Sequence, residues 1–374
     1  MPSPPSPQQV PVQLPAQVPV VVLAGFLGSG KTTLLNHLLH RSGGSRIGAI
    51  VNDFGAIEID AMAVAGALGD STVSLGNGCL CCAVDAGELD HYLDRLVNPS
   101  LGIDVVVIEA SGLAEPQELV RMVLASENPR VVYGGLVEVV DAAEIDGTRA
   151  RHPELDRHLG LADLVVVNKL DRTADGARVL ELVRSLNDRA AVVPATYGRV
   201  DPAFFFDCRP GEERIGQLSF DDLHDDADAG DGHTGHLHTA YDSLSFSSGV
   251  PIDPRRLMEF LDSRSEGLYR IKGCVDLGAY DVRNRYAVHA VGRFLRFYPE
   301  PWPPGEDRLT RLVLIGSGID TEYLAKALEA CRNDAPHTAD EHGLWGVLRY
   351  VRDPDGPGAE EEPPVRSGPY PLRK

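Results

Sequence analysis

Residues 25–32, Gly-Phe-Leu-Gly-Ser-Gly-Lys-Thr, form a glycine-rich motif that ends in a lysine and a hydroxyl. The motif has the pattern G-x-x-x-x-G-K-[ST] and lies between an apolar run and a helix-like run. The backbone N–H groups of such a loop, together with the N-terminus of the following helix, bind phosphate oxygens. We expect Lys31 to reach the outer phosphates and to act in catalysis, and the Thr32 hydroxyl to ligate Mg²⁺. The predicted nucleotide contacts are Gly25, Gly28, Ser29, Gly30, Lys31, Thr32 and Thr33.

Asn168, Lys169 and Asp171 belong to an Asn-Lys-Leu-Asp motif that follows a later apolar run. A buried carboxylate at Asp171 would accept hydrogen bonds from the ring N–H and the exocyclic amine of guanine. Adenine has no such pair of donors and would leave the buried charge unpaired, which costs several kcal/mol. Asn168 would brace the loop, and the stem of Lys169 would cover the base. With the first motif upstream, this pattern predicts GTP as the ligand.

Two further carboxylates are candidates for work at the phosphates. Glu109 ends an apolar run, as a Walker B aspartate does, and would hold Mg²⁺ directly or through water. The alternative is a capped glutamate at the end of a buried strand. Asp53 follows the second apolar run and is placed to act as a switch residue near Mg²⁺ or the attacking water. The predicted catalytic residues are therefore Lys31, Asp53 and Glu109.

Cys79, Cys81 and Cys82 lie within four consecutive positions. Thiolates are soft ligands that suit Zn²⁺ and similar ions. One short loop does not complete a four-coordinate site, so the remaining ligands must come from elsewhere in the protein, from water or from a partner. Such an open site suits a transferable metal better than a structural one. Cys79 and Cys81 are the first choice as ligands, since adjacent residues point apart. The alternatives are a redox-active dithiol and buried small side chains.

Composition narrows the partners. The net charge is −20, which repels nucleic acid and anionic membranes. No apolar run reaches the roughly 18 residues of a membrane-spanning helix, and no Lys or Arg precedes Lys31 as a secretory signal would require. These features predict a cytoplasmic protein. The oligomeric state is not readable from the sequence.

Two groups of elements must position these residues. Apolar runs predict strands at 18–24, 46–52, 105–110, 131–142, 164–169 and 191–195, and helical patterns between them include 31–40, 87–96 and 116–125. Apolar strands that alternate with helices predict an α/β fold with a mostly parallel sheet. From residue 241 the pattern changes to strands at 241–248, 268–277, 286–292, 293–299 and 311–316, with helices at 254–263 and 320–331. This order predicts a smaller α+β domain.

The predicted organisation has five parts: a disordered Pro-rich tail (1–17), the nucleotide-binding α/β domain (18–212), an Asp/His-rich linker (213–240), the α+β domain (241–351) and a disordered acidic, Pro-containing tail (352–374). Within the linker, residues 221–238 hold many Asp and His residues. Two interpretations of this tract stay open, a loose metal-binding segment and a solvated connection.

With these residues in hand, the chain resembles the CobW-like family of P-loop GTPases. The segments that carry the resemblance are GFLGSGKTTLLNHLL, VNDFGAIEID, NGCLCC, IEASGLAEP, VVDA, NKLD, YRIKGCVDL and LVLIGSGID. The resemblance implies an N-terminal P-loop GTPase domain, a C-terminal α+β domain and a cytosolic metallochaperone or metal insertase. One departure is the switch segment, which usually reads NEFG followed by Glu and here has Asp53 and Ala56. That change weakens any metal role for this segment.

The hypothesis that follows is a two-state switch that needs GTP, Mg²⁺ and a transition metal, zinc foremost and otherwise Co²⁺ or Fe²⁺. GTP would draw residues 52–60 and 78–82 toward the γ-phosphate and assemble the metal site. Hydrolysis would release the metal to a client metalloprotein. Intrinsic hydrolysis should be slow, because the sequence shows no arginine finger. The alternatives are cobalt delivery to corrinoid synthesis, delivery of iron or cobalt to a nitrile hydratase, a non-catalytic metal buffer and a redox-sensing GTPase.

Overall fold

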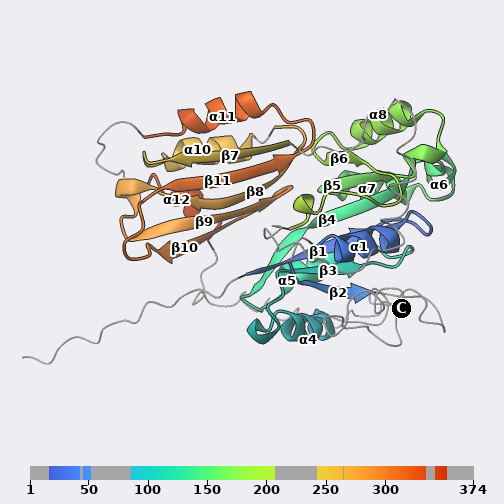
Figure 1. Cartoon of the computed structure of the whole chain (residues 1–374), viewed down its shortest axis with the longest axis horizontal. Helices are drawn as coiled ribbons and strands as arrows, with labels where there is room; N and C mark the ends of the chain where they lie inside the picture. Colours follow the sequence, from blue (N-terminus) through green and yellow to red (C-terminus); the bar gives the residue numbers. More distant parts are fainter. Residues whose placement is uncertain are drawn as a thin grey trace, which may run out of the picture.

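The computed structural model describes residues 17–42, 45–51, 86–206, 242–263, 265–333 and 342–351. They form two domains that lie side by side (Figure 1), an α/β domain described as far as Phe206 and an α+β domain described from Asp242. The predicted fold class is confirmed. The two tails and the Asp/His-rich linker lie outside the described residues. Among the helices of the described ranges, none has the length and apolarity that crossing a membrane would need.

The α/β domain is built on a six-stranded parallel sheet. Its strands are β1 (Val18–Ala24), β2 (Ile47–Val51), β3 (Val105–Glu109), β4 (Val131–Asp141), β5 (Leu164–Asn168) and β6 (Ala191–Pro194). They are buried on both faces and rich in β-branched residues, as parallel strands under helices must be. The strand order is β2-β3-β1-β4-β5-β6. The chain therefore changes sides at β1, and the loop after β1 lies at the switch point where such sheets bind ligands.

Helices cover both faces of this sheet. They are α1 (Lys31–His40), α4 (Ala86–Leu96), α5 (Pro116–Ala125), α6 (Ile145–Arg151), α7 (Glu154–Leu161) and α8 (Gly176–Leu186), with short 3-10 turns η2 (Pro99–Leu101), η3 (Leu170–Arg172) and η4 (Pro202–Phe204). Leucines of α1 share one core cluster with β1, β3 and β4, whereas α4 and α5 pack on the other residues of the same strands. The alternation of β1 between the two clusters follows from the two-residue period of a strand.

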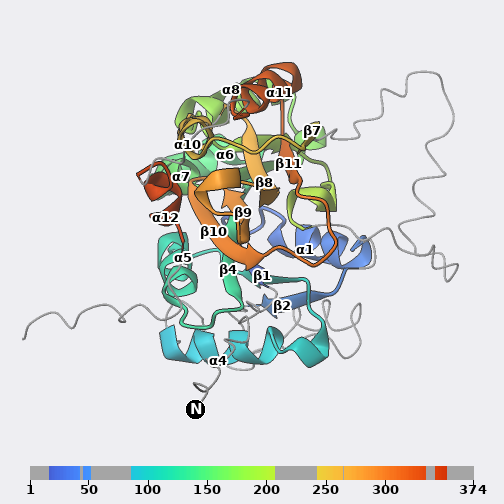
Figure 2. The same cartoon turned by 90° about the vertical axis from the view of Figure 1, so that its left-hand side faces the viewer.

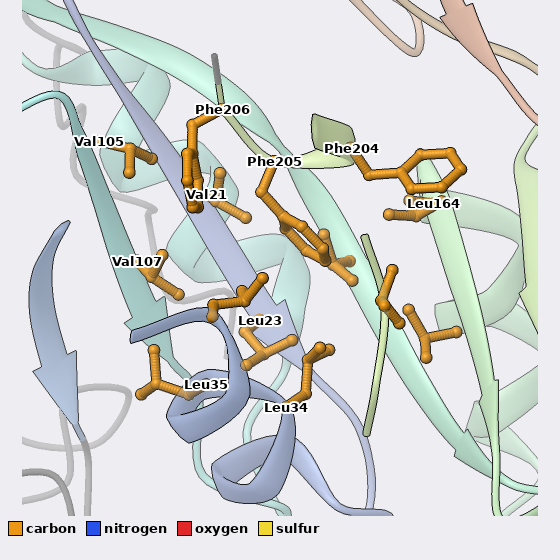
Figure 3. Close-up of a cluster of buried hydrophobic side chains, with 14 of the residues drawn as sticks. Val21, Leu23, Leu34, Leu35, Val105, Val107, Leu164, Phe204, Phe205 and Phe206 are labelled. Atoms are coloured by element: carbon orange, nitrogen blue, oxygen red, sulfur yellow. The ribbon is translucent and has the colours of Figure 1, made fainter. Parts of the chain in front are cut away.

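Three consecutive phenylalanines close the α1 face of the sheet. Phe204, Phe205 and Phe206 are all buried. Figure 3 shows Phe206 beside Val21 of β1 and Phe204 beside Leu164 of β5, so the triplet lies across several strands. Tyr269 of the second domain belongs to the same core cluster as this aromatic layer.

The second domain contains an antiparallel sheet. Its strands are β7 (Asp242–Ser248), β8 (Leu268–Val275), β9 (Asn284–Val291), β10 (Phe294–Pro301) and β11 (Thr310–Gly316), in the order β10-β9-β8-β11-β7. The remaining elements are α10 (Pro254–Asp262), the short turn η5 (Gly278–Tyr280), α11 (Thr321–Ala330) and α12 (Trp345–Leu348). Helices α10 and α11 lie together on one face of the sheet (Figure 1 and Figure 2) and share its core.

Asp163 fastens the two domains together. Its carboxylate accepts hydrogen bonds from the Tyr133 hydroxyl at 2.6 Å and the Leu136 N–H at 2.9 Å, both on β4. It also accepts the backbone N–H of Arg293, in the β9–β10 hairpin, at 3.4 Å. Burial and the nearby carboxylate raise the pKa of Tyr133 well above its usual value, so the hydroxyl stays a proton donor. A buried charge with several donors of this kind holds the hairpin against β4.

Strand β4 bulges where the second domain contacts it. Its pairing with β1 passes from Tyr133 opposite Val20 to Gly135 opposite Val21, which leaves Gly134 as the extra residue. The Tyr269 hydroxyl donates to the Gly134 carbonyl at 3.3 Å, and a Cβ on Gly135 would come within 2.7 Å of that hydroxyl. The bulge thus lets the second domain approach the backbone of β4.

Candidate functional site

The loop after β1 has a backbone that requires glycine. Gly25 has φ +142°, and a Cβ there would lie 2.4 Å from the Val139 carbonyl oxygen. Gly30 has φ +104°, and a Cβ there would lie 2.3 Å from the side-chain amide of Asn168. Gly30 is also the N-cap of α1 and no side chain caps that helix end. The N–H groups of the first turn therefore face the loop as an anion-binding site would need.

Lys31 occupies the centre of this loop. Its side chain is 7% exposed. The ammonium donates to the carbonyl oxygens of Gly25 at 2.9 Å and Phe26 at 3.3 Å. The charge is therefore held inside the curl where phosphate oxygens are predicted to lie. Ser29 is buried beside it, and Thr33 is exposed in the first turn of α1.

Thr32 and Glu109 are brought together from α1 and the end of β3. The Thr32 hydroxyl donates to a carboxylate oxygen of Glu109 at 2.7 Å. Glu109 is buried, and its strand pairs with β1 immediately before the loop. A hydroxyl and a carboxylate are hard oxygen donors of the kind that Mg²⁺ prefers. The pair therefore fits the predicted Mg²⁺ ligands, although the sequence did not predict their direct hydrogen bond.

Asn168 links the two predicted nucleotide motifs. Its buried amide donates to the Ser29 carbonyl at 2.9 Å. Its side-chain oxygen accepts the Gly198 N–H at 2.9 Å. The neighbouring Lys169 has φ +60°, and its ammonium donates to the Gly28 carbonyl at 2.6 Å and to Asp141 at 2.7 Å. The structure thus brings together, in or against one loop, Gly25, Gly28, Ser29, Gly30, Lys31, Thr32, Thr33, Glu109, Asn168 and Lys169.

Asp171 differs from the expectation. Selection of guanine over adenine was expected to depend on a buried Asp171 carboxylate. In the structure this carboxylate is exposed in η3. No residue of this 3-10 turn is buried, so the turn presents the carboxylate to solvent. A bound base would have to supply the burial itself.

A cluster around Phe26 was not singled out from the sequence. The Phe26 ring stacks on His158 with centroids 5.8 Å apart. Arg157 donates to both carboxylate oxygens of Glu115 at 2.7 and 2.6 Å, and His158 lies 3.4 Å from the same carboxylate. Burial lowers the pKa of His158, with Glu115 acting in the opposite direction. These contacts hold the phosphate loop, the start of α5 and α7 together. Residues 42 positions apart give no local sequence signal for such a pair.

Glu138 was also missed. It lies on β4, fully buried, and within the described residues neither carboxyl oxygen has a hydrogen-bond partner. Burial raises its pKa to about 8, and the Lys31 ammonium acts in the opposite direction. The group is therefore mostly protonated at neutral pH. The available signal was an acidic residue inside an apolar run, which by itself does not show burial.

The substitution Glu138→Gln should make stability less dependent on pH. As pH rises from about 4.5 to about 8, the unfolded chain releases this proton while the folded chain keeps it. The wild-type protein therefore loses folding stability over that range, on the order of 5 kcal/mol in total. Glutamine has no proton to release. The free energy of unfolding of the variant should therefore increase relative to that of the wild type as pH rises. Urea unfolding at pH 5, 7 and 8.5 measures this difference.

A variant-to-wild-type difference that stays constant with pH would contradict this account. Glu144→Gln, an exposed carboxylate just after the same strand, is the control for the loss of one negative charge.

Four predicted residues lie outside the described residues, Asp53 and the cysteines at 79, 81 and 82. The described residues show where that part of the chain leaves the sheet. Val51 is the last residue of β2 and pairs with Glu109 of β3. Within the described ranges, no group of three or more His, Cys, Asp or Glu side chains is arranged to hold a metal ion.

Two family models match the chain. A model described as the nucleotide-binding domain of CobW, HypB and UreG matches residues 19–194. A second, described as the C-terminal domain of the cobalamin synthesis protein CobW, matches residues 241–332. Together they cover both domains of the structure.

Three characterised relatives are similar to the chain. A zinc chaperone CobW of a Sinorhizobium species is 30% identical over 336 residues, which span 80% of this chain and 93% of the relative. A zinc chaperone CobW of Pseudomonas aeruginosa is 32% identical over 368 residues, with 86% and 93% covered. The zinc-regulated GTPase metalloprotein activator 1 of Schizosaccharomyces pombe is 31% identical over 194 residues, with 49% and 47% covered.

Proposed function

This chain belongs to the CobW family of P-loop nucleotide-binding proteins, and from that premise we propose that it is a GTP-hydrolysing metallochaperone. It binds a transition metal, zinc foremost, at Cys79, Cys81 and Cys82. It then transfers the metal to a client protein in a way that depends on the bound nucleotide.

The described residues supply the parts that GTP binding needs. Lys31 and the first turn of α1 hold the outer phosphates, and Asp171 selects guanine. Thr32 and Glu109 would hold Mg²⁺, which when bound would neutralise charge that develops on the phosphates. Lys31 would stabilise the same charge, because its ammonium is already held inside the loop by two carbonyl oxygens. Asp53, which lies outside the described residues, would act as a switch residue near Mg²⁺ or the attacking water.

The observation that carries the coupling is the pairing of Val51 with Glu109. The stretch that contains Asp53 and the three cysteines begins directly after Val51, and so beside the predicted Mg²⁺ ligand. Binding of GTP and its metal at Glu109 draws this stretch toward the phosphates and brings the thiolates into one site. Hydrolysis removes the γ-phosphate, and the site opens.

Release to a client requires a large change in metal affinity. A change of about 10⁴-fold needs about 5.5 kcal/mol of differential binding, which the loss of one thiolate ligand can supply. Thiolates bind zinc, cobalt and iron alike, so the ligand set alone does not choose the metal. The names of the three relatives above favour zinc.

Metal affinity measured with a GTP analogue, with GDP and without nucleotide tests this function. We expect the affinity for zinc to be highest with the analogue, by about three to four orders of magnitude over GDP. Cobalt and iron measured in parallel identify the preferred ion. Equal zinc affinity in all three nucleotide states would contradict the proposal.

These affinities, together with GTP turnover with and without zinc and a test for disulfide formation, separate the alternatives. A cobalt or iron chaperone would show the nucleotide-dependent difference with its own ion and a smaller one with zinc. A metal buffer would bind zinc without any metal-dependent change in GTP turnover. A redox-sensing GTPase would form a disulfide among the three cysteines under mild oxidant and hold metal equally in each nucleotide state.

A further inference from the structure

Residues 196–199 form a tight turn directly after β6. The Arg199 N–H donates to the Thr196 carbonyl at 3.1 Å, and the two central residues, Tyr197 and Gly198, have φ of +53° and +67°. These angles define a type I′ turn, in which Asn and Gly are the usual central residues. A tyrosine with positive φ is a conformational outlier that costs stability.

The side chain of Tyr197 makes no stabilising contact with the described residues that would offset this cost. Tyr197 is 68% exposed. Its hydroxyl and its ring contact no described residue through a hydrogen bond or a ring interaction. Among described non-glycine residues, only Lys169 shares a positive φ, and Lys169 belongs to the guanine motif. An unfavourable backbone that presents a bare aromatic ring indicates a function for that ring.

The turn is bound to the nucleotide motifs on two sides. Gly198 donates to Asn168 at 2.9 Å, and the Leu170 N–H donates to the Ala195 carbonyl at 3.3 Å. A Cβ on Gly198 would lie 2.8 Å from the Leu34 nitrogen, so the turn also packs against the start of α1. A base held by Asp171, one residue after Leu170, would therefore lie beside this turn.

We propose that Tyr197 is a purine-stacking residue that covers the guanine base once nucleotide binds. The inference rests on the GTP binding proposed above. An aromatic ring stacks on the flat face of any purine, whereas Asp171 reads the edge of the base. Tyr197 would thus add affinity for any purine nucleotide, and Asp171, on the adjacent loop, would select guanine.

Calorimetric titration of the full chain with Mg²⁺·GDP tests this role. Tyr197→Ala should weaken GDP binding by about 5- to 100-fold, the range for loss of one aromatic stack. Tyr197→Phe, which keeps the ring, should bind within about twofold of the wild type. Tripolyphosphate, which has no base, should bind the wild type and Tyr197→Ala equally.

The thermal stability of the nucleotide-free protein distinguishes a stacking role of Tyr197 from a purely structural one. Tyr197→Gly places the residue that best tolerates φ +53°, so the nucleotide-free protein should unfold at a higher temperature while its GDP affinity falls. Unchanged GDP affinity in Tyr197→Ala, or an equal loss for tripolyphosphate, would overturn the assignment. A wild-type protein that binds no GDP would refute the proposed function instead.

Discussion

Changing Lys31 to alanine is expected to lower the rate of GTP hydrolysis by about two to three orders of magnitude. The ammonium is buried in the loop, where two carbonyl oxygens hold it at the proposed site of the phosphates. A charge fixed in advance stabilises the transition state without reorganisation, and alanine offers no substitute. Single-turnover hydrolysis at saturating GTP measures the loss.

Lys326→Ala is the matched control. That lysine lies exposed on α11, where it pairs with Glu322, and its loss should leave turnover unchanged. The folded state of Lys31→Ala should be checked by its unfolding temperature, since a slow enzyme and an unfolded one give the same rate. Turnover within tenfold of the wild type would contradict the catalytic role of Lys31.

Replacing Cys79 and Cys81 together by serine should abolish the nucleotide dependence of zinc binding. The proposed difference of about 10⁴-fold between GTP and GDP states comes from thiolates that meet only in the GTP state. Serine hydroxyls are poor ligands for zinc at neutral pH because they remain protonated. Competition with a chromophoric chelator, in the presence of GTP analogue or GDP, measures both affinities.

The control for this experiment is Cys274→Ser, which removes a partly exposed thiol from β8 of the second domain. GTP affinity should be the same in both variants and in the wild type. A double variant that still binds zinc more tightly with GTP than with GDP would place the coupled metal site elsewhere in the chain.

The elements of the α/β domain could be predicted closely from the sequence. Parallel strands buried on both faces are continuous apolar runs, and the predicted limits of β1 and α1 agree with the structure residue for residue. The phosphate loop could be predicted because its function depends on local spacing. The order of the antiparallel strands could not, since it depends on pairings between residues far apart, such as β11 with β7.

The parts of the site that escaped prediction depend on tertiary surroundings. Glu138 is one acidic residue in an apolar run, and its burial follows from the helices that cover β4. The positive φ of Tyr197 follows from contacts of its turn with Asn168 and α1. Asp171 is exposed because its turn η3 buries none of its residues, which the local pattern did not indicate.

Strand β4 also imposes a mechanical constraint. One end of this strand bonds to the second domain at Tyr133 and Gly134, and the other end carries Glu138 and Asp141 next to the phosphate loop. A hydrogen-bonded strand stretches very little along its axis. A displacement at one end of β4 therefore also displaces the other end, unless the strand bends between them. The bulge at Gly134 interrupts the regular pairing of β4 with β1. If the second domain moves relative to the first, we expect β4 to bend at this bulge.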